Sequence, residues 1–550
     1  MAPGRSLFHQ RWGVQGMKSQ VFSDPVELEL FRHLLASIAE EMGAVLRKTA
    51  YSANIKERRD YSCALYDAAG HTIAMGDHMP VHLGAMPLSV EHAIAAFRLR
   101  PGDVAILNDP FRGGTHLPDI TAVSGVFLGG AARPAFYVAN RAHHADVGGM
   151  SPGSMPLARE IYQEGIRIPP VLLVRQGAMD AEILSLILAN VRTPEEREGD
   201  LLAQLAGIRR GETRLRELVS RYSYPVVRRN VAALQDYSER MVRAAIASLR
   251  PGVYRFEDYL DNDGLSDRPV KIAVTVTIRG DSAVVDFAGS DPQVAGSVNA
   301  NYAIALSATA YVFRCLVTGD IPYTAGLLRP LQVLAPDRSV VNAREPAAMA
   351  AGNVETSQRI TDVILGALAQ AAPLRIPAAS SGTMNNLTFG GWDTFRNRPF
   401  AWYETIAGGM GASASNDGLS ATHTHMTNSW NTPIEAFEHQ YPVRILEYAI
   451  RKNSGGAGRR RGGDGIVRQF EFLAPCEVTI LSDRRLRGPY GLSGGEPGRP
   501  GRNTLIRGSK TIALRGKERF EARPGDRLRI ESPGGGGFGG SAATTPPKSI

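Results

Sequence analysis

The chain has 550 residues, a formal net charge of +8, 43% hydrophobic residues and 21% charged residues. This length is too great for one simple core, so we expect several subdomains in an ordinary soluble protein. The basic residues are spread along the chain rather than interleaved with aromatic ones, which argues against nucleic acid as a partner. No apolar run approaches the roughly twenty residues that cross a membrane, so we expect no membrane partner either.

The three cysteines lie far apart and show no CxxC spacing, at Cys63, Cys315 and Cys476. We therefore expect three buried thiols in a reducing compartment rather than a disulfide framework. The first twenty or so residues are basic and lack the apolar core of a secretory signal. A cytoplasmic protein is the expectation.

The pattern of elements predicts an α/β protein with mixed sheets and a β-rich C-terminal region. We expect residues 1–22 to be a disordered or non-native tail, 23–190 an α/β region that carries the site, 191–440 a central helical and mixed-sheet region, 441–540 the β-rich region, and 541–550 a second tail.

The N-terminal region begins with the clearest helix of the chain, at residues 26–48. Ser23 or Asp24 can cap this helix, and Pro25 suits its first position. The elements expected after it are a hairpin at 63–66 and 72–75, a helix at 89–97, a strand at 104–107, and a strand pair at 124–128 and 135–139.

Two of these strands run into polar clusters. The first cluster is residues 108–119, in which His116 and Asp119 lie three residues apart behind a glycine-rich turn. If the two strands are neighbours in one sheet, both clusters lie at the same edge of that sheet. The second cluster, residues 140–149, contributes the polar side chains of His143, His144 and Asp146.

These clusters contain the donor atoms of a metal site. His116, Asp119 and His143 offer two imidazole nitrogens and a carboxylate oxygen, which are ordinary ligands of zinc and similar divalent ions. Asp60, beside the strand at 63–66, is the candidate for a fourth ligand. Three ligands and a water would make a catalytic centre, at which hydrolysis becomes feasible at neutral pH.

His144 and Asp146 would then orient the ligands or carry protons. The alternative is that His116 and Asp119 only cap turns while the other two histidines form hydrogen bonds in the core. The density of such residues at two strand ends favours the metal site.

Further along the chain the pattern predicts helices, hairpins and polar loops. Residues 193–250 are expected to be helical, with four acidic residues on solvated faces: Glu195, Glu196, Glu198 and Asp200. The other expected elements are a hairpin at 272–278 and 283–287, buried helices at 301–317 and 358–372, polar loops at 352–357, 380–386 and 404–409, and strands at 467–472, 478–481 and 527–531.

Residues 422–428, Thr-His-Thr-His-Met-Thr-Asn, carry another pair of histidines. Their alternation predicts a strand with His423 and His425 on one face. No third ligand is near them in sequence, so we favour a substrate-facing or interface role over a metal-binding pair.

No nucleotide-binding motif is supported by its context. Gly534, Gly536 and Gly539 fit GxGxxG, but no helix can follow within the last residues. The segment 508–511 resembles a Walker lysine only superficially, because the required glycine spacing is absent. We therefore expect no ATP site in this chain.

The chain resembles the hydantoinase B/oxoprolinase family from about residue 24 to residue 540. This family comprises B subunits of ATP-dependent hydantoinases and 5-oxoprolinases, and the large subunits of acetone and acetophenone carboxylases are similar to it. The resemblance implies a divalent ion, zinc or manganese, held by Asp60, His116, Asp119 and His143. Its most specific stretches are 55–62, 80–87, 108–119, 140–149, 380–386 and 533–539.

The resemblance also implies a partner, a hydantoinase A-type subunit that holds ATP and magnesium, with two copies of each subunit in the complex. In that picture the partner phosphorylates the carbonyl oxygen of a cyclic amide, and the ring opens at the metal site of this chain. One alternative is the large subunit of an ATP-dependent ketone carboxylase. Another, from a different class, is a non-catalytic scaffold for the A subunit.

Overall fold

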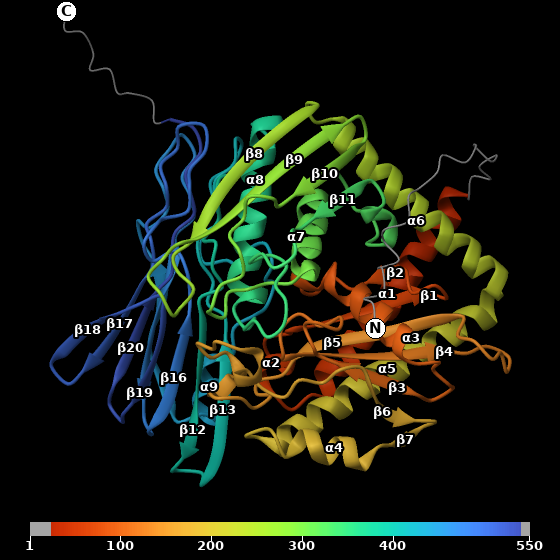
Figure 1. Ribbon diagram of the computed structural model, residues 1–550, viewed down its shortest axis with the longest axis horizontal. Coiled ribbons are helices and arrows are strands. Elements are labelled where there is room, and N and C mark those ends of the chain that lie inside the picture. Colours follow the sequence, from red (N-terminus) through yellow and green to blue (C-terminus); the bar gives the residue numbers. More distant parts are fainter. Residues whose placement is uncertain (1–23, 541–550) are drawn as a thin grey trace, which may run out of the picture.

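The computed structural model describes residues 24–540, and both predicted tails, 1–22 and 541–550, lie outside this range. Helices and strands alternate through four sheets, so the predicted α/β class is confirmed. Figure 1 shows the N-terminal sheet and the β-rich C-terminal region on opposite sides, with the central sheet and helices α7 and α8 between and above them. Within the described residues no helix is both long and apolar enough to cross a membrane.

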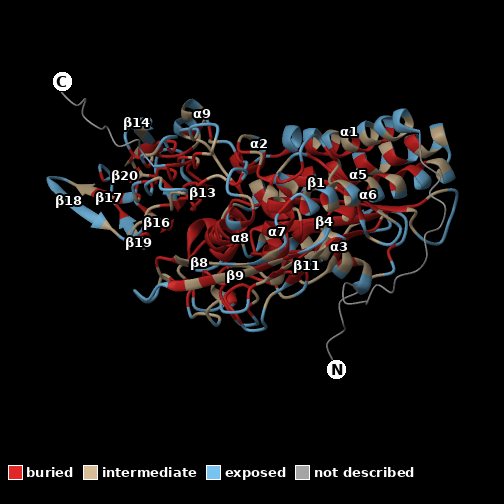
Figure 2. Ribbon diagram, turned by 90° about the horizontal axis from the view of Figure 1, so that it is seen from above, coloured by how far each residue is buried: buried red, intermediate tan, exposed pale blue. Residues whose placement is uncertain are grey.

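The first helix, α1 (Pro25–Thr49), begins as its sequence predicted. The carboxylate of Asp24 accepts a hydrogen bond from the backbone N–H of Val26 at 3.0 Å, which satisfies one of the free donors at the helix start. Apolar residues at helical spacing bury one stripe of α1, which packs against α5 (Pro194–Tyr222). Figure 2 shows the outer surface of α1 exposed and the strands beneath it buried. The buried stripe includes Phe31, Leu35, Ile38, Met42 and Leu46.

A seven-stranded antiparallel sheet forms the N-terminal region. Helices α1 and α5 cover one face, and the shorter helix α3 (Ala85–Ala96) covers the other, so the strands are apolar on both faces. The strands in spatial order are β2 (Thr72–Met75), β1 (Tyr61–Asp67), β5 (Phe136–His143), β4 (Asp119–Val126), β3 (Val104–Leu107), β6 (Val171–Arg175) and β7 (Ala178–Met179).

This strand order brings the two polar clusters together. Strands β3 and β5 are not direct neighbours, because β4 lies between them and pairs antiparallel with both. They therefore run in the same direction, and both end at the same edge of the sheet. Strand β4 starts at that edge with Asp119, which pairs in register with His143.

The central region packs two buried helices against a second sheet. Helices α7 (Tyr302–Cys315) and α8 (Ser357–Ala371) lie in the largest apolar core, and α8 contacts β8 and β9. A π-helix, Gly352–Thr356, leads directly into α8. This sheet contains β11 (Leu331–Leu334), β10 (Ser282–Asp286), β9 (Val270–Arg279) and β8 (Gly252–Leu260), and α6 (Tyr224–Ala247) follows α5.

The C-terminal region consists of two antiparallel sheets around an aromatic core, in which the ring centroids of Trp402 and Phe389 lie 4.6 Å apart. One sheet contains β13 (Arg398–Glu404), β12 (Asn386–Asp393), β16 (Cys476–Leu481) and β19 (Lys517–Ala522). The other contains β14 (Val443–Arg451), β15 (Gly465–Phe472), β20 (Arg527–Glu531), β17 (Arg502–Arg507) and β18 (Lys510–Leu514). The remaining short helices are α2 (Ala53–Lys56), α4 (Ala181–Leu188) and α9 (Ile434–Gln440).

Two predictions about side-chain environment were wrong. Asp200 is fully buried rather than solvated, because its carboxylate pairs with Arg197 at 3.0 Å and accepts the backbone N–H groups of Tyr51 and Ser52. Cys315 is exposed rather than buried, because it ends α7 at the rim of the core.

Two predictions about local backbone were also wrong. The expected polar loop at 352–357 is instead the buried π-helix. Residues 422–428 form no strand beyond an isolated bridge at Thr422, and His425 has a φ of +59°. The two histidines therefore do not share a strand face: His425 approaches Tyr311, whereas His423 lies near Asn431.

Candidate metal centre

The strand ends bring His116, Asp119 and His143 into one buried group. One ligand atom from each residue lies within 4.8 Å of the other two, and this is the one such group of three or more among residues 24–540. The Asp119 Oδ1 atom lies 3.2 Å from His116 Nε2 and 3.3 Å from His143 Nδ1. The three side chains are almost inaccessible to solvent. We call them the trio below.

The protonation of the trio suits a cation. Burial alone would raise the pKa of Asp119, but the neighbouring His116 and His82 hold it well below its ordinary value. Burial lowers the pKa of His143, which keeps its imidazole neutral. An ionised carboxylate next to a neutral imidazole is the state in which both groups bind a divalent ion.

The hydrogen bonds of the trio leave one carboxylate oxygen and one imidazole nitrogen without a partner. His116 Nδ1 lies 3.1 Å from the carbonyl oxygen of Ala350, so this nitrogen is the donor and Nε2 keeps its lone pair. Asp119 Oδ1 and His143 Nε2 are buried and have no hydrogen-bond partner. Buried polar atoms rarely remain unpaired, and the donor set fits a divalent ion.

Three side chains that the sequence did not assign complete the surroundings of the trio. His82 Nε2 lies 3.3 Å from Asp119 Oδ2, while its Nδ1 lies 2.8 Å from the Ser62 hydroxyl. The amide of Asn353 lies 3.1 Å from His116 Nε2. The ring of Tyr403 stacks on that of His143, with centroids 4.4 Å apart. His82 lies in one of the family-specific stretches, 80–87, and Asn353 in the expected polar loop at 352–357, whereas Tyr403 lies in neither kind of segment.

The other predicted site residues lie next to the trio but outside it. The backbone carbonyl of Asp60 accepts the N–H of His143 at 3.0 Å, and its carboxylate lies 3.7 Å from the Arg58 guanidinium. His144 Nε2 lies 2.9 Å from Gln204 Oε1, and burial lowers the pKa of His144 to about 4.

Asp146 is engaged on both oxygens. It accepts backbone N–H groups of Gly148, Gly153 and Arg192, and it pairs with the Arg192 guanidinium at 3.0 Å. These contacts fix the loop after β5. The catalytic roles assigned to His144 and Asp146 remain predictions.

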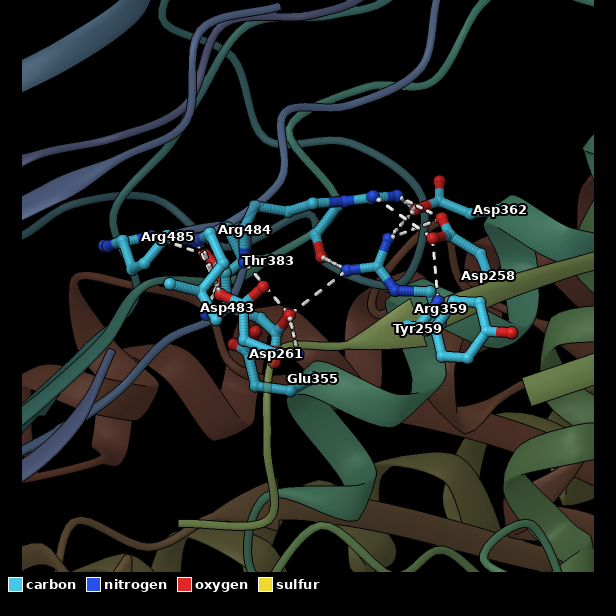
Figure 3. Close-up of polar contacts among 12 residues, drawn as sticks. Asp258, Tyr259, Asp261, Glu355, Arg359, Asp362, Thr383, Asp483, Arg484 and Arg485 are labelled. Carbon is cyan, nitrogen blue, oxygen red and sulfur yellow. Dashed lines mark hydrogen bonds and ion pairs between the residues drawn. The ribbon is translucent and has the colours of Figure 1, made fainter. Parts of the chain in front are cut away.

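A buried network of charges lies on the other side of the π-helix (Figure 3). Arg359 pairs with Asp362 at 2.8 Å and with Asp258 at 3.1 Å, and Arg484 pairs with the same two carboxylates at 2.7 and 2.6 Å. Glu355 faces this network, and burial raises its pKa to about 7. The π-helix thus carries Asn353 toward the trio and Glu355 toward the network.

Comparisons with known proteins place the whole described chain in one group. A family model described as hydantoinase B/oxoprolinase matches residues 24–541. An uncharacterized protein of Methanocaldococcus jannaschii is 40% identical over 94% of this chain and 91% of its own length. The 5-oxoprolinase 1 of Arabidopsis thaliana is also 40% identical over 94% of this chain, which spans only 42% of that protein.

Two solved structures share the fold. The ATP-dependent caprolactamase from Pseudomonas jessenii superposes with a TM-score of 0.87 at 30% identity, over 94% of this chain and 91% of that one. Acetone carboxylase in its nucleotide-free form gives a TM-score of 0.86 at 19% identity, over 94% of this chain and 76% of that one. At the lower identity the likeness shows the fold alone.

Proposed function

Because this chain belongs to the hydantoinase B/oxoprolinase family, as its motifs predicted, we propose that it is the B-type component of an ATP-dependent cyclic amidohydrolase. It opens a lactam or hydantoin-like ring at the trio. The observation that carries this proposal is the trio itself, a buried group of two imidazoles and a carboxylate with the donor atoms of a divalent-metal site. The likeness to a caprolactamase, an enzyme named for a cyclic amide, supports the substrate class.

The residues of the trio prepare the site for that chemistry. A divalent ion there, zinc or manganese, would polarise the amide carbonyl and make water a nucleophile at neutral pH. The Ala350 carbonyl fixes the tautomer of His116, and burial keeps His143 neutral. Asp60 remains our proposal for a further ligand, because its backbone carbonyl accepts the N–H of His143 and its charge acts on the His143 imidazole.

A second chain completes the proposed enzyme. We propose a hydantoinase A-type partner that holds ATP and magnesium and activates the cyclic amide, in a complex with two copies of each chain. The family resemblance supports this assignment, and so does the ATP dependence in the name of the caprolactamase. No observation on this chain favours a ketone carboxylase, because the likeness to acetone carboxylase extends to the fold alone.

The proposal is tested by replacing His116. The chain is co-expressed with its A-type partner and assayed for ATP-dependent opening of 5-oxoproline and hydantoin, alongside metal analysis of the purified complex. We expect His116→Ala to abolish ring opening and to reduce the bound divalent ion to less than about half of the wild-type amount. The matched control is His439→Ala, an exposed histidine on α9, which should leave both unchanged.

Each alternative has its own signature in this assay. Full turnover by His116→Ala, with intact metal content, would show that the trio is not the centre. Strict dependence of product formation on bicarbonate would favour the carboxylase. Activity of the partner without any metal bound to this chain would favour the scaffold.

A further inference from the structure

The wall of the metal centre opposite strands β4 and β5 is built by residues 349–353, more than 200 residues downstream of the trio. Ala350 accepts the Nδ1–H of His116, and the π-helix Gly352–Thr356 follows immediately. A π-turn is a rare, widened helical turn that is found disproportionately at functional sites. Here it directs the side chain of Asn353 onto the trio.

The Asn353 amide contacts two members of the trio, one through a ring nitrogen and the other through its outer carboxylate oxygen. Its Nδ2 is 3.1 Å from His116 Nε2 and 3.3 Å from Asp119 Oδ2. His116 Nε2 carries the lone pair of its ring, because Nδ1 donates to Ala350. The side chain is buried, and its Oδ1 has no hydrogen-bond partner. Asn353 therefore uses one end of its amide on the trio and leaves the other end unsatisfied.

The two ends of an amide have nearly the same size and shape, and rotation about the Cβ–Cγ bond exchanges them. With lone pairs facing it, the amide turns its N–H groups to the trio. A divalent cation bound by the trio accepts the lone pairs of His116 and Asp119 and repels the amide N–H groups. The amide oxygen of Asn353 is then the end that faces the cation. Amide oxygens are ordinary ligands of hard divalent ions.

We propose that Asn353 supplies a neutral oxygen ligand to the divalent ion held by His116, Asp119 and His143. This inference rests on the proposed metal centre. It adds an oxygen donor to a set of two nitrogens and one carboxylate, which makes the centre more suitable for manganese than the trio alone. It also assigns a role to the π-helix, because a regular α-helical turn would place the side chain of residue 353 in a different direction from the trio.

The test measures metal binding rather than turnover. The full-length chain is stripped with a chelator and titrated with Mn²⁺, and the EPR signal of free Mn²⁺ gives the Kd. We expect Asn353→Ala to weaken binding at least about 10-fold. Asn353→Asp keeps an oxygen at the same place and should bind within about 3-fold of the wild type or more tightly. Loss of binding in Asn353→Asp equal to that in Asn353→Ala would overturn the proposal.

A spectrum distinguishes a ligand from a hydrogen-bond donor. The visible absorption of bound Co²⁺ depends on the number and type of ligands. Asn353→Ala should change the intensity and position of its bands, whereas Asn353→Asp should change them much less. Weakened Mn²⁺ binding with an unchanged Co²⁺ spectrum would show that Asn353 only positions His116 and Asp119, and would also overturn the proposal.

Asn301 provides a closely matched control. Its amide is also buried with an unpaired Oδ1, and its Nδ2 donates to the carbonyl oxygens of Pro110 and Gly114 at 2.8 Å, in the loop that carries His116. Asn301→Ala should lower the Tm but leave the Mn²⁺ Kd within about 3-fold. Equal weakening by Asn301→Ala would mean that loosening of the loop explains the effect.

The outcomes separate this inference from the proposed function. If the wild-type chain and Asn353→Ala bind Mn²⁺ equally well, Asn353 is not a ligand, but the proposed metal centre is unaffected. A wild-type chain that binds neither Mn²⁺ nor Zn²⁺ overturns both. Thermal unfolding of each variant shows whether it is folded before the titration.

Discussion

Glu164 is a buried carboxyl group that helps to hold the wall of the metal centre. Its Oε1 accepts the backbone N–H groups of Met349 and Ala350 at 2.7 and 2.9 Å. Burial raises its pKa to about 8, against an ordinary value of 4.5, although these two hydrogen bonds oppose the rise. The group therefore stays protonated in the folded chain at neutral pH.

This raised pKa predicts a specific loss of stability with pH. As the pH rises from about 4.5 to about 8, the unfolded chain releases the Glu164 proton while the folded chain keeps it, so the free energy of unfolding falls across this window. Glu164→Gln cannot titrate and keeps the acceptor oxygen. We expect the variant to match the wild type at pH 4.5 and to exceed it by about 4 kcal/mol at pH 8 in urea unfolding. Parallel pH profiles of the two proteins would contradict this.

Local spacing was enough to predict the trio but not its surroundings. His116 and Asp119 lie three residues apart, and His143 ends a strand, so each is visible in a short window of sequence. Asn353 and Tyr403 reach the site through the tertiary fold, across more than 200 residues. No periodicity or motif near them indicates a site, because their roles depend on which segments become neighbours.

At the scale of elements, the π-helix is the feature that brings Asn353 to the site. It can form only because Gly352 packs against the backbone: a Cβ atom there would lie 1.8 Å from the carbonyl oxygen of Asn299. Any side chain at this position must displace the turn that carries Asn353.

We therefore expect Gly352→Ala to lower the free energy of unfolding by about 3 kcal/mol and to weaken metal binding as well. The control is Gly280→Ala, in the turn between β9 and β10, where a Cβ meets no atom within 4 Å and the φ of +59° costs only about 1 kcal/mol. Metal binding should be unchanged in that control. Denaturant unfolding and metal titration check both variants, and an unchanged metal Kd in Gly352→Ala would contradict the prediction.

Elements with strong periodicity were predicted well. The helix α1, the hairpin of β1 and β2, the buried helices α7 and α8, and the strand β20 lie where their patterns placed them. The segments 352–357 and 422–428 were predicted wrongly, because their backbone conformations are determined by burial against other segments. A polar composition indicated a loop in the first case, and an alternating pattern indicated a strand in the second.

At the scale of the whole molecule, the network of Figure 3 joins the central region to the C-terminal sheets. Asp258 belongs to β8 and Asp362 to α8, whereas Arg484 follows β16. Arg484 is 2% exposed and contacts both carboxylates, of which Asp362 is fully buried and Asp258 is 12% exposed, so the two regions share charges that are largely shielded from water. Burial raises the pKa of Asp362 to about 7 even with two arginines beside it.

This arrangement predicts strong coupling between the regions. Arg484→Met leaves Asp258 and Asp362 with Arg359 alone, and should lower the free energy of unfolding by about 3–5 kcal/mol at pH 8. The loss should be smaller at pH 5.5, because Asp362 can then take up a proton and its charge disappears.

Asp362→Asn removes the carboxylate charge at every pH. The double variant should be more stable than the sum of the two single changes predicts, by more than about 1 kcal/mol, in urea unfolding at pH 8. Additive effects would show that the carboxylate and the guanidinium stabilise their regions separately and that the network does not bind the two halves together.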